Sequence, residues 1–420
     1  MRTDASRPPQ SALVVGAGMA GLATAWFLQE RGVEVTVVER RRVAAGASWG
    51  NAGWLSPSLA VPLPAPAMLR TGLRELLSPA SPLYVPPRAD PGLGRFLAAL
   101  AGNCTDRRWR VSMSALAPLN RRALDAYDAL GDGGVKEPTV SSDRFLIVCR
   151  TATERQAFVD ELERVRAAGQ DVDYEPLTGT QVRDAEPALS DAVGPGLLLH
   201  GQRYIDPPAF IAALADSVRA RGGRIVEDSP VRSVRDTGDA AVVATAAGTT
   251  LRADAVVLAA GAWLTPLARA FGVRTPVQAG RGYSFSVSGR LLPSGPTYFP
   301  GQHVVCTPLG DGRVRVSGMM EFTAPDRPLD PRRVRAVIAA ARPMLRDVDW
   351  DARTDEWVGS RPCSTDGLPL VGPTRSPRVF VCGGHTMWGI ALGPLTGRLL
   401  AEAMTTGRPA PELTPLHPLR

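Results

Sequence analysis

Three glycines and one carboxylate near the start of the chain have the types and spacing of a dinucleotide site. Gly16, Gly18 and Gly21 follow the apolar run 13–15, and Glu39 follows a second apolar run. In this pattern Gly16 permits a tight turn, Gly18 lets the backbone approach a pyrophosphate, and Gly21 lets the next helix pack on the strand. The carboxylate can accept hydrogen bonds from both ribose hydroxyls and repels a 2′-phosphate. The spacing therefore predicts a site for an adenine dinucleotide.

The elements around these residues are those that such a site requires. The segment from Met19 to Arg31 is predicted as a helix with an apolar side, and Gly32 ends it. The unpaired N–H groups and the positive dipole end of this helix would face the phosphates. Residues 35–38 are predicted as a second buried strand, which places Glu39 at its end.

Three further side chains are candidates for chemistry on a substrate. The planar guanidinium of Arg361 can hold a carboxylate through two parallel hydrogen bonds, although an ion pair between domains would also explain it. Tyr283 could add a hydroxyl to that carboxylate, or be a core aromatic in an alternating strand. His385 could face the reacting groups, or be a structural histidine. Trp54 and Trp388 could wall an apolar pocket, and simple packing explains them equally well.

Composition excludes several classes of protein. The 420 residues are 44% hydrophobic with a net charge of +7, and the arginines are scattered, which indicates a solvated surface and no nucleic-acid partner. No apolar run approaches the roughly 18 residues of a membrane span. The first ten residues lack the apolar core of a secretory signal, so we expect a cytoplasmic protein. Five widely spaced cysteines without a CxxC pair, and four histidines without ligand spacing, predict reduced thiols and no metal site.

The rest of the chain alternates between helical and strand patterns. Small residues fill 44–54, which predicts a loop that a ligand approaches closely, and frequent prolines in 56–91 predict coil and short helices, in the manner of an active-site cover. Helical spacing is found over 95–130, 153–168, 206–221, with Asp206 as N-cap, and 390–404. Strand patterns occupy 145–148, 224–226, 231–235, 241–245, 255–258, 283–287, 303–305, 313–316 and 379–381, and those at 145–148 and 283–316 predict an antiparallel sheet distinct from the first.

Five stretches, in order and spacing, resemble a known family over nearly the whole chain. They are Gly16-x-Gly18-x-x-Gly21 with Glu39; Ser48-x-x-Asn51-Ala52-Gly53 with Ser56-Pro57; Arg281-Gly282-Tyr283-Ser284; Gly359-x-Arg361-Pro362-x-x-x-Asp366-Gly367-x-Pro369; and Gly383-Gly384-His385 leading into Gly389-Ile390. The sequence resembles the FAD-dependent amine and amino-acid oxidoreductases that include D-amino acid oxidase, glycine oxidase and sarcosine oxidase. It is most similar to the bacterial D-amino acid dehydrogenase branch.

The resemblance implies an α/β fold in which a Rossmann-like FAD-binding domain is interleaved with a second α+β domain built on a mostly antiparallel sheet. The FAD-binding domain would comprise residues 1–60, 196–270 and 345–420. The substrate-binding domain would comprise residues 61–195 and 271–344.

The resemblance also implies the residues of the site. Arg361 would bind the substrate carboxylate, with Tyr283 and His385 beside it as catalytic residues. A helix that begins near Ile390 would stabilise the negative charge of a reduced flavin. The residues that would contact FAD are Gly16, Ala17, Gly18, Ala20, Gly21, Glu39, Arg40, Ser48, Asn51, Ala52, Gly53, Val231, Ala260, Gly261, Gly384, His385, Trp388, Gly389 and Ile390. Cys363 does not match the cysteine that carries a covalent flavin in sarcosine oxidase.

The implied reaction is the oxidative deamination of a D-amino acid, or a related imino acid, by hydride transfer from the α carbon to flavin N5. Water then hydrolyses the imine to a 2-oxo acid and ammonia, and oxygen, a quinone or a carrier protein reoxidises the flavin. The alternatives are a glycine- or sarcosine-type amine oxidase, an NAD-dependent dehydrogenase, which would not need the segments around Asn51 and His385, and a flavoprotein subunit of a larger dehydrogenase. The apolar, Pro-rich stretch 55–68 could touch a membrane or a quinone, and a lid is the favoured interpretation.

Overall fold

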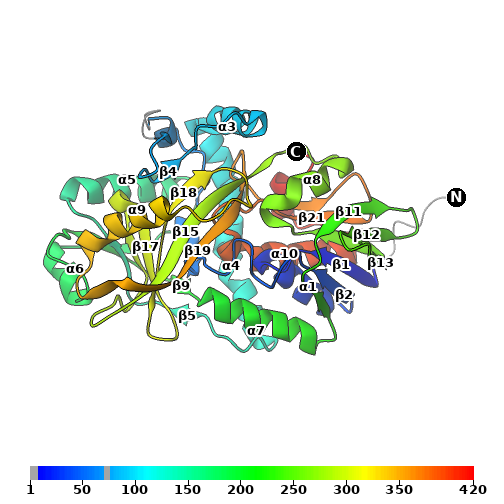
Figure 1. The fold of residues 1–420 in the computed structure, drawn as a ribbon, viewed down its shortest axis with the longest axis horizontal. Coiled ribbons are helices and arrows are strands. Elements are labelled where there is room, and N and C mark those ends of the chain that lie inside the picture. Colours follow the sequence, from blue (N-terminus) through cyan, green and yellow to red (C-terminus); the bar gives the residue numbers. More distant parts are fainter. Residues whose placement is uncertain (1–7, 71–75) are drawn as a thin grey trace.

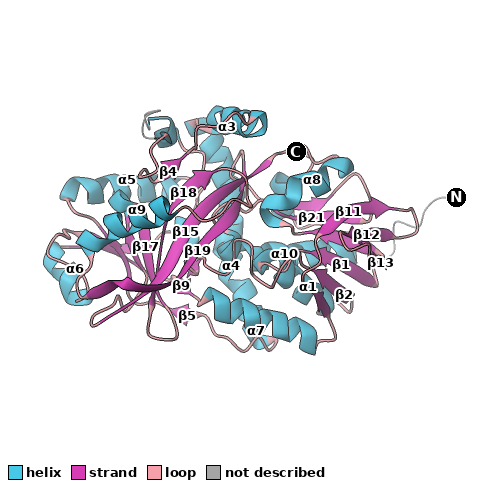
Figure 2. Cartoon of the chain, viewed as in Figure 1, coloured by secondary structure: helices cyan, strands magenta, loops and turns pink. Residues whose placement is uncertain are grey.

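The computed structural model describes residues 8–70 and 76–420. Residues 1–7 of the predicted FAD-binding domain and residues 71–75 of the predicted Pro-rich coil lie outside this range. Two large sheets lie next to each other, one on each side of the view in Figure 1. Figure 2 shows helices packed against both of them.

The first sheet has six strands in the order β10-β2-β1-β14-β21-β20. Its neighbouring strands are parallel except for β20, which runs antiparallel to β21. The strands are β1 (Ser11–Val15), β2 (Glu34–Val38), β10 (Arg224–Val226), β14 (Ala255–Leu258), β20 (Leu370–Pro373) and β21 (Val379–Gly383). The predicted runs before the glycine turn and before Glu39 are thus adjacent strands, so their carboxyl ends meet at one edge.

Alternate residues of β1 explain why both faces of this sheet are covered. Ala12 and Val14 belong to the core beneath the helices, whereas Leu13 and Val15 pack against a second, three-stranded antiparallel sheet. The covering helices are α1 (Met19–Gln29), α4 (Asp106–Asp132), α7 (Pro207–Ala220) and α10 (Gly389–Thr406). The three-stranded sheet consists of β11 (Val231–Asp236), β12 (Ala241–Thr245) and β13 (Thr250–Ala253).

Helices α1 and α10 cross closely because α10 presents glycine at the contact. A Cβ atom on Gly397 would lie 2.8 Å from the backbone nitrogen of Thr24 on α1. This approach brings the N-terminal ends of both helices to the edge where the parallel strands end, since residues from each line the same cavity there.

The second large sheet has nine strands, with β19-β15-β18-β17-β16-β6-β8-β7 in order and β4 paired to β18. They are β4 (Leu83–Tyr84), β6 (Phe145–Val148), β7 (Tyr174–Leu177), β8 (Gly196–Leu199), β15 (Val277–Gly289), β16 (Thr297–Phe299), β17 (Val304–Pro308), β18 (Val314–Phe322) and β19 (Val348–Ser364). Most pairs are antiparallel, as predicted. Strand β6 at 145–148 belongs to this sheet, as predicted, and pairs antiparallel with β8 but parallel with β16. Strand β4 is also parallel to β18.

The remaining elements connect and cover these sheets. A small sheet contains β3 (Trp54–Leu55), β5 (Val140–Ser141) and β9 (Arg203–Tyr204), and further helices are α3 (Pro91–Asn103), α5 (Ala152–Ala167), α6 (Gly179–Ala185), α8 (Leu264–Ala268) and α9 (Pro331–Ala341). The 3₁₀ segments are η1 (Pro57–Leu59), η2 (Pro66–Arg70), η3 (Gly261–Trp263), η4 (Arg269–Phe271), η5 (Pro300–Gln302), η6 (Arg342–Met344) and η7 (Pro411–Leu416).

Two predicted helix starts differ in the structure, and the domain boundaries stay a proposal. The helical pattern at 95–130 contains two helices, because the Thr105 side chain accepts a hydrogen bond from the Arg108 amide and starts α4 afresh. Asp206 stands at the N-cap of α7 but its side chain makes no capping bond. The predicted domain boundaries at 196 and 345 would assign β8 and β19 to the FAD-binding domain, whereas both strands hydrogen-bond within the nine-stranded sheet. We therefore propose boundaries after β8 and after β19.

Among the described residues, no helix combines the length and apolar composition that a membrane crossing requires.

Candidate active site

A cavity of about 440 Å³ opens where the parallel strands of the six-stranded sheet end. Most residues predicted to contact a cofactor line it: Gly16, Gly18, Ala20, Gly21, Glu39, Arg40, Ser48, Asn51, Val231, Ala260, Gly261, His385, Gly389 and Ile390, together with Arg361. The other predicted site residues are not in this lining: Ala17, Ala52, Gly53, Tyr283, Gly384 and Trp388. The structure thus brings the predicted dinucleotide site and the predicted substrate arginine into one space.

The three glycines of the turn differ in what a side chain would meet. Gly16 has φ +113°, and a Cβ there would lie 2.4 Å from the Ala259 carbonyl oxygen. A Cβ on Gly21 would lie 2.0 Å from the Gly16 carbonyl oxygen. A Cβ on Gly18 would meet only the Ser48 hydroxyl oxygen, at 3.2 Å. Gly16 and Gly21 are therefore required by the fold itself, whereas Gly18 leaves open the space that a pyrophosphate would occupy.

Two helix N-termini without caps face this cavity. Neither α1 nor α10 has a side-chain cap or an acidic residue in its first turn, and the first residues of both line the cavity. One amide, that of Met19, meets the Ser48 hydroxyl at 3.2 Å. Free amides and positive dipole ends favour an anionic ligand. This arrangement fits a dinucleotide with phosphates at α1 and a ring that becomes negative on reduction at α10.

The Glu39 side chain is fixed by backbone amides at the end of β2. Its Oε2 accepts from the Ala17 amide at 2.8 Å and its Oε1 accepts from the Arg41 amide at 3.0 Å. Glu39 is 8% exposed and lines the cavity. It is thereby positioned to accept hydrogen bonds from ribose hydroxyls, and the residues present fit an adenine dinucleotide.

The Arg361 guanidinium lies at the cavity without a carboxylate partner. Its Nη1 donates to the Met319 carbonyl at 3.0 Å, and no carboxylate of the described residues lies within ion-pair distance. Burial lowers the pKa of Arg361, because desolvation disfavours the charged guanidinium. Met319 has φ +63° in a bulge of β18, so strained backbone supplies the acceptor that orients the guanidinium. A substrate carboxylate would supply the missing counter-charge.

Gly282 on β15 makes room for the Arg361 head group. A Cβ on Gly282 would lie 2.2 Å from the guanidinium carbon. Because that neighbour is the end of a flexible side chain, we expect Gly282→Ala to fold and keep its cofactor but displace the guanidinium. The expected result is a rise in KM of roughly tenfold to a hundredfold, as for loss of a charged hydrogen bond. Steady-state kinetics would check it, with Gly310→Ala, where a Cβ meets nothing, as control. An unchanged KM would contradict the placement.

His385 joins the turn after β21 to α10. Its ring Nε2 lies 2.8 Å from the Thr396 hydroxyl oxygen, and that hydroxyl donates to the carbonyls of Leu392 and Gly393. Burial lowers the pKa of His385 to about 4, so the ring stays neutral in the range where enzymes are assayed. This geometry favours a role in positioning the cavity wall.

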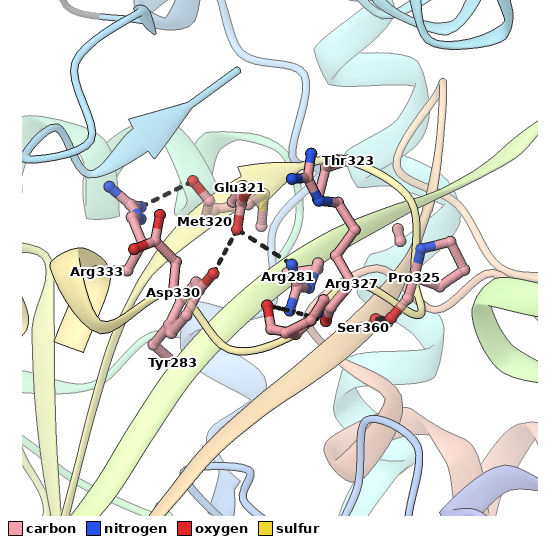
Figure 3. A network of polar contacts seen from close by, with 12 residues as sticks. Arg281, Tyr283, Met320, Glu321, Thr323, Pro325, Arg327, Asp330, Arg333 and Ser360 are labelled. Carbon is pink, nitrogen blue, oxygen red and sulfur yellow. Dashed lines mark hydrogen bonds and ion pairs between the residues drawn. The ribbon is translucent and has the colours of Figure 1, made fainter. Parts of the chain in front are cut away.

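The hydroxyl of Tyr283 is engaged elsewhere. Figure 3 shows Tyr283 and Arg281 both directed at Glu321, and the tyrosine hydroxyl donates to that carboxylate at 2.5 Å. Arg281 pairs with the same carboxylate at 3.5 Å. Burial and the neighbouring Glu321 raise the pKa of Tyr283, which therefore stays protonated. Arg333 completes this buried network and donates to the Met320 carbonyl.

The small-residue loop packs tightly against protein. Gly53 has φ +77°, and a Cβ on it would lie 2.2 Å from the Ile205 carbonyl oxygen. A Cβ on Gly50 would overlap the Trp357 ring. The indole nitrogens of the two tryptophans considered as pocket walls are satisfied within the protein, Trp54 by the Thr307 hydroxyl and Trp388 by the Val61 carbonyl.

The small-residue loop predicted to lie close to a ligand contributes Gly46 and Ala47 to the cavity lining. The lining residues that were not predicted as site residues are Val15, Met19, Val38, Arg41, Pro230, Arg232, Ala259, Trp263, Pro266, Leu267, Asp326, Ser360, Pro362, Cys382, Gly383, Thr386 and Met387. Many of them are adjacent in the sequence to residues that were predicted, and this adjacency is the signal that could have identified them. Asp326 adjoins none and had no signal. The five cysteines are unpaired and buried, and the described residues hold no cluster of possible metal ligands.

The parallel sheet, glycine turn, terminal carboxylate and arginine-bearing cavity define a dinucleotide-dependent oxidoreductase. Residues 11–403 match the family FAD dependent oxidoreductase. A D-amino acid dehydrogenase of Rhizorhabdus wittichii is 31% identical over 408 residues, which cover 95% of this chain and 97% of that relative. The chain therefore belongs to the FAD dependent oxidoreductase family, and its cofactor is FAD.

Solved structures agree on the fold. A glycine oxidase from Geobacillus kaustophilus gives a TM-score of 0.72 at 24% identity, over 99% of both chains. The L-alpha-glycerophosphate oxidase of Mycoplasma pneumoniae, solved with FAD bound, gives a TM-score of 0.72 at 19% identity, over 96% of both chains. The predicted fold class, a Rossmann-like FAD-binding domain with a second α+β part, is confirmed.

Proposed function

We propose that the protein oxidises a D-amino acid, or a related imino acid, to a 2-oxo acid and ammonia. The observation that carries this proposal is the Arg361 guanidinium, which lies without a carboxylate partner in the same cavity as the dinucleotide residues. The match over nearly the whole chain to a relative named D-amino acid dehydrogenase supports the substrate class.

Arg361 binds and orients the substrate carboxylate. Its planar head group offers two parallel N–H donors, which fix both the position and the direction of a carboxylate. One edge is already held by the Met319 carbonyl, so the remaining donors keep a constant direction. Orientation of the substrate in this way lowers the barrier because the reacting bond is presented in one geometry.

The reaction requires few proton transfers to or from side chains of the protein. The α carbon gives up a hydride, the amine nitrogen gives up a proton, and water then adds to the imine and releases ammonia. FAD, when bound, supplies the two-electron acceptor for the hydride. Only the neutral amine has the lone pair that expels the hydride, so the substrate must first lose its ammonium proton. His385 is neutral and could accept that proton only weakly because of its low pKa.

The reduced cofactor needs a second partner, which we propose to be oxygen, a quinone or a carrier protein. The segment 55–68 is the candidate contact with a membrane or a quinone, and part of it packs on the protein: Leu59, Val61 and Ala65 pack against the cluster around Trp54 and Phe145. That packing favours a lid over an exposed anchor.

Anaerobic bleaching of the flavin by paired enantiomers tests the proposal. With the carboxylate fixed on Arg361, inversion at the α carbon exchanges the amine and the side chain, so we expect one hand to react faster by at least about tenfold, or 1.4 kcal/mol in barrier. The similarity to a relative named D-amino acid dehydrogenase is the reason to expect that the faster hand is D. The rate should rise with pH as the substrate ammonium loses its proton. Because the pKa of His385 is about 4, this rise will not report on that residue.

Each other outcome points to a different function. Equal rates for both hands would contradict the binding mode, and so would a rate that does not depend on amine protonation. Fast bleaching by glycine or sarcosine alone would favour an amine oxidase. A flavin that none of these compounds reduces would favour a silent subunit.

A further inference from the structure

Three partly exposed side chains that line the FAD cavity meet one another. Arg40 follows β2, Trp263 ends η3 after β14, and Asp326 lies in the loop between β18 and α9. The first two therefore belong to the six-stranded sheet and Asp326 to the nine-stranded sheet. Their contacts connect the two parts of the molecule across the cavity.

Each member of this group contacts the other two. Asp326 Oδ1 accepts from Arg40 Nη2 at 2.9 Å, and Asp326 Oδ2 accepts from Trp263 Nε1 at 2.8 Å. The Arg40 guanidinium lies over the Trp263 ring at 4.1 Å. Partial burial opposes the ionisation of Asp326, but hydrogen bonds from Trp263 and Arg40 hold its pKa below the ordinary value. We call these three residues the clasp.

The loop that carries Asp326 is anchored on both sides of it. Figure 3 shows the anchors: the Ser360 hydroxyl donates to the Pro325 carbonyl at 2.9 Å, and Arg281 Nη2 donates to the Arg327 carbonyl at 2.6 Å. Arg281 is 1% exposed and is itself held by Glu321. Asp326 is therefore presented from a loop that is held on both sides.

We propose that Asp326 closes the cavity over bound FAD, so that the clasp must open before the cofactor can enter or leave. This inference needs only the cofactor and is independent of the substrate. Its consequence is kinetic: breaking the clasp should accelerate both release and uptake of FAD, because a gate obstructs both directions. The Arg40–Asp326 pair is partly exposed, so salt should weaken it.

The test measures FAD release from the holoenzyme by the fluorescence of free FAD after dilution. We expect Asp326→Ala to raise the release rate roughly tenfold, and Asp326→Asn and Trp263→Phe, which each keep part of the clasp, roughly threefold to fivefold. Uptake of FAD by the apoprotein should accelerate as well. Asp239→Ala is the matched control. It removes an exposed ion pair between Asp239 and Arg252, and neither residue lines the cavity.

Salt dependence separates the gate from a general loss of structure. Release from the wild type should accelerate as salt rises, whereas release from Asp326→Ala should be fast and nearly independent of salt. If Asp326→Ala misfolds, as judged by circular dichroism, Trp263→Phe and Asp326→Asn decide the question. Wild-type release rates in those two variants would overturn the proposal. Faster release of FAD combined with slower uptake of FAD would also overturn the proposal. That pattern indicates that the variant has lost affinity for FAD, whereas opening a gate accelerates both steps.

Discussion

Replacement of Arg361 by alanine is expected to lower kcat/KM for the amino-acid substrate by roughly two to three orders of magnitude, since truncation of one partner of a buried, hydrogen-bonded charge pair costs about 2–5 kcal/mol. The reason is that the described residues offer no other carboxylate partner to this guanidinium, so its free donors are available to the substrate. Arg361→Lys keeps the positive charge but loses the planar pair of N–H donors, so its kcat/KM should lie between those of Arg361→Ala and the wild type.

Two further variants make this result specific. Arg361→Gln retains a donor for the Met319 carbonyl without the charge, so it should bind substrate poorly even though its fold is preserved. Arg353→Ala removes another arginine of β19, which pairs with Glu356 on the surface, and should leave the kinetics unchanged. Steady-state rates on FAD-loaded protein check these expectations. Near-normal turnover in folded Arg361→Ala would move the carboxylate site elsewhere.

Local signals were sufficient to predict the FAD-binding part of the fold. The apolar runs before Gly16 and Glu39 form adjacent buried strands. The run before Gly16 is apolar throughout because alternate residues of β1 contact a hydrophobic core on each face of the sheet. The glycine positions follow from close approaches between backbone atoms a few residues apart or at the next strand. Such constraints act on residue type directly, so a sequence displays them.

Long-range pairing was harder to predict. Strand β19 spans 17 residues and carries Arg361, yet its charged sequence and two register shifts against β15 conceal the alternation. Asp326 shows the same limit within the site, because its partners Arg40 and Trp263 lie far away in the sequence. Contacts of this kind depend on how two sheets meet, and no local pattern records that.

Whether the Tyr283 side chain reaches the cavity depends on which face of strand β15 it projects from. Gly282, against which the Arg361 guanidinium lies, and Tyr283 are neighbours on β15, so their side chains point to opposite faces of the sheet. Tyr283 therefore packs in the core beside Phe285 and reaches Glu321. Residue type alone favoured neither face, and contact of Tyr283 with substrate stays a prediction.

Gly18→Val should yield a folded protein that retains less than about a tenth of the wild-type FAD. Gly18 has φ −82° and ψ 179°, an extended conformation that valine adopts readily, and a Cβ there meets only the Ser48 hydroxyl. The new side chain would instead fill the space between the N-terminus of α1 and the pyrophosphate. Flavin absorbance per protein measures the loss.

Thermal unfolding with and without added FAD separates this effect from misfolding. A ligand that binds only the folded state raises its melting temperature, so added FAD should stabilise wild-type apoprotein and leave Gly18→Val unchanged. Gly21→Val offers the contrast, because its Cβ would lie 2.0 Å from the Gly16 carbonyl oxygen and should destabilise the apoprotein itself. Gly102→Ala, where a Cβ meets nothing, should keep the wild-type load of FAD and the wild-type increase in melting temperature on addition of FAD. A Gly18→Val protein with a full load of FAD would exclude this turn as the pyrophosphate site.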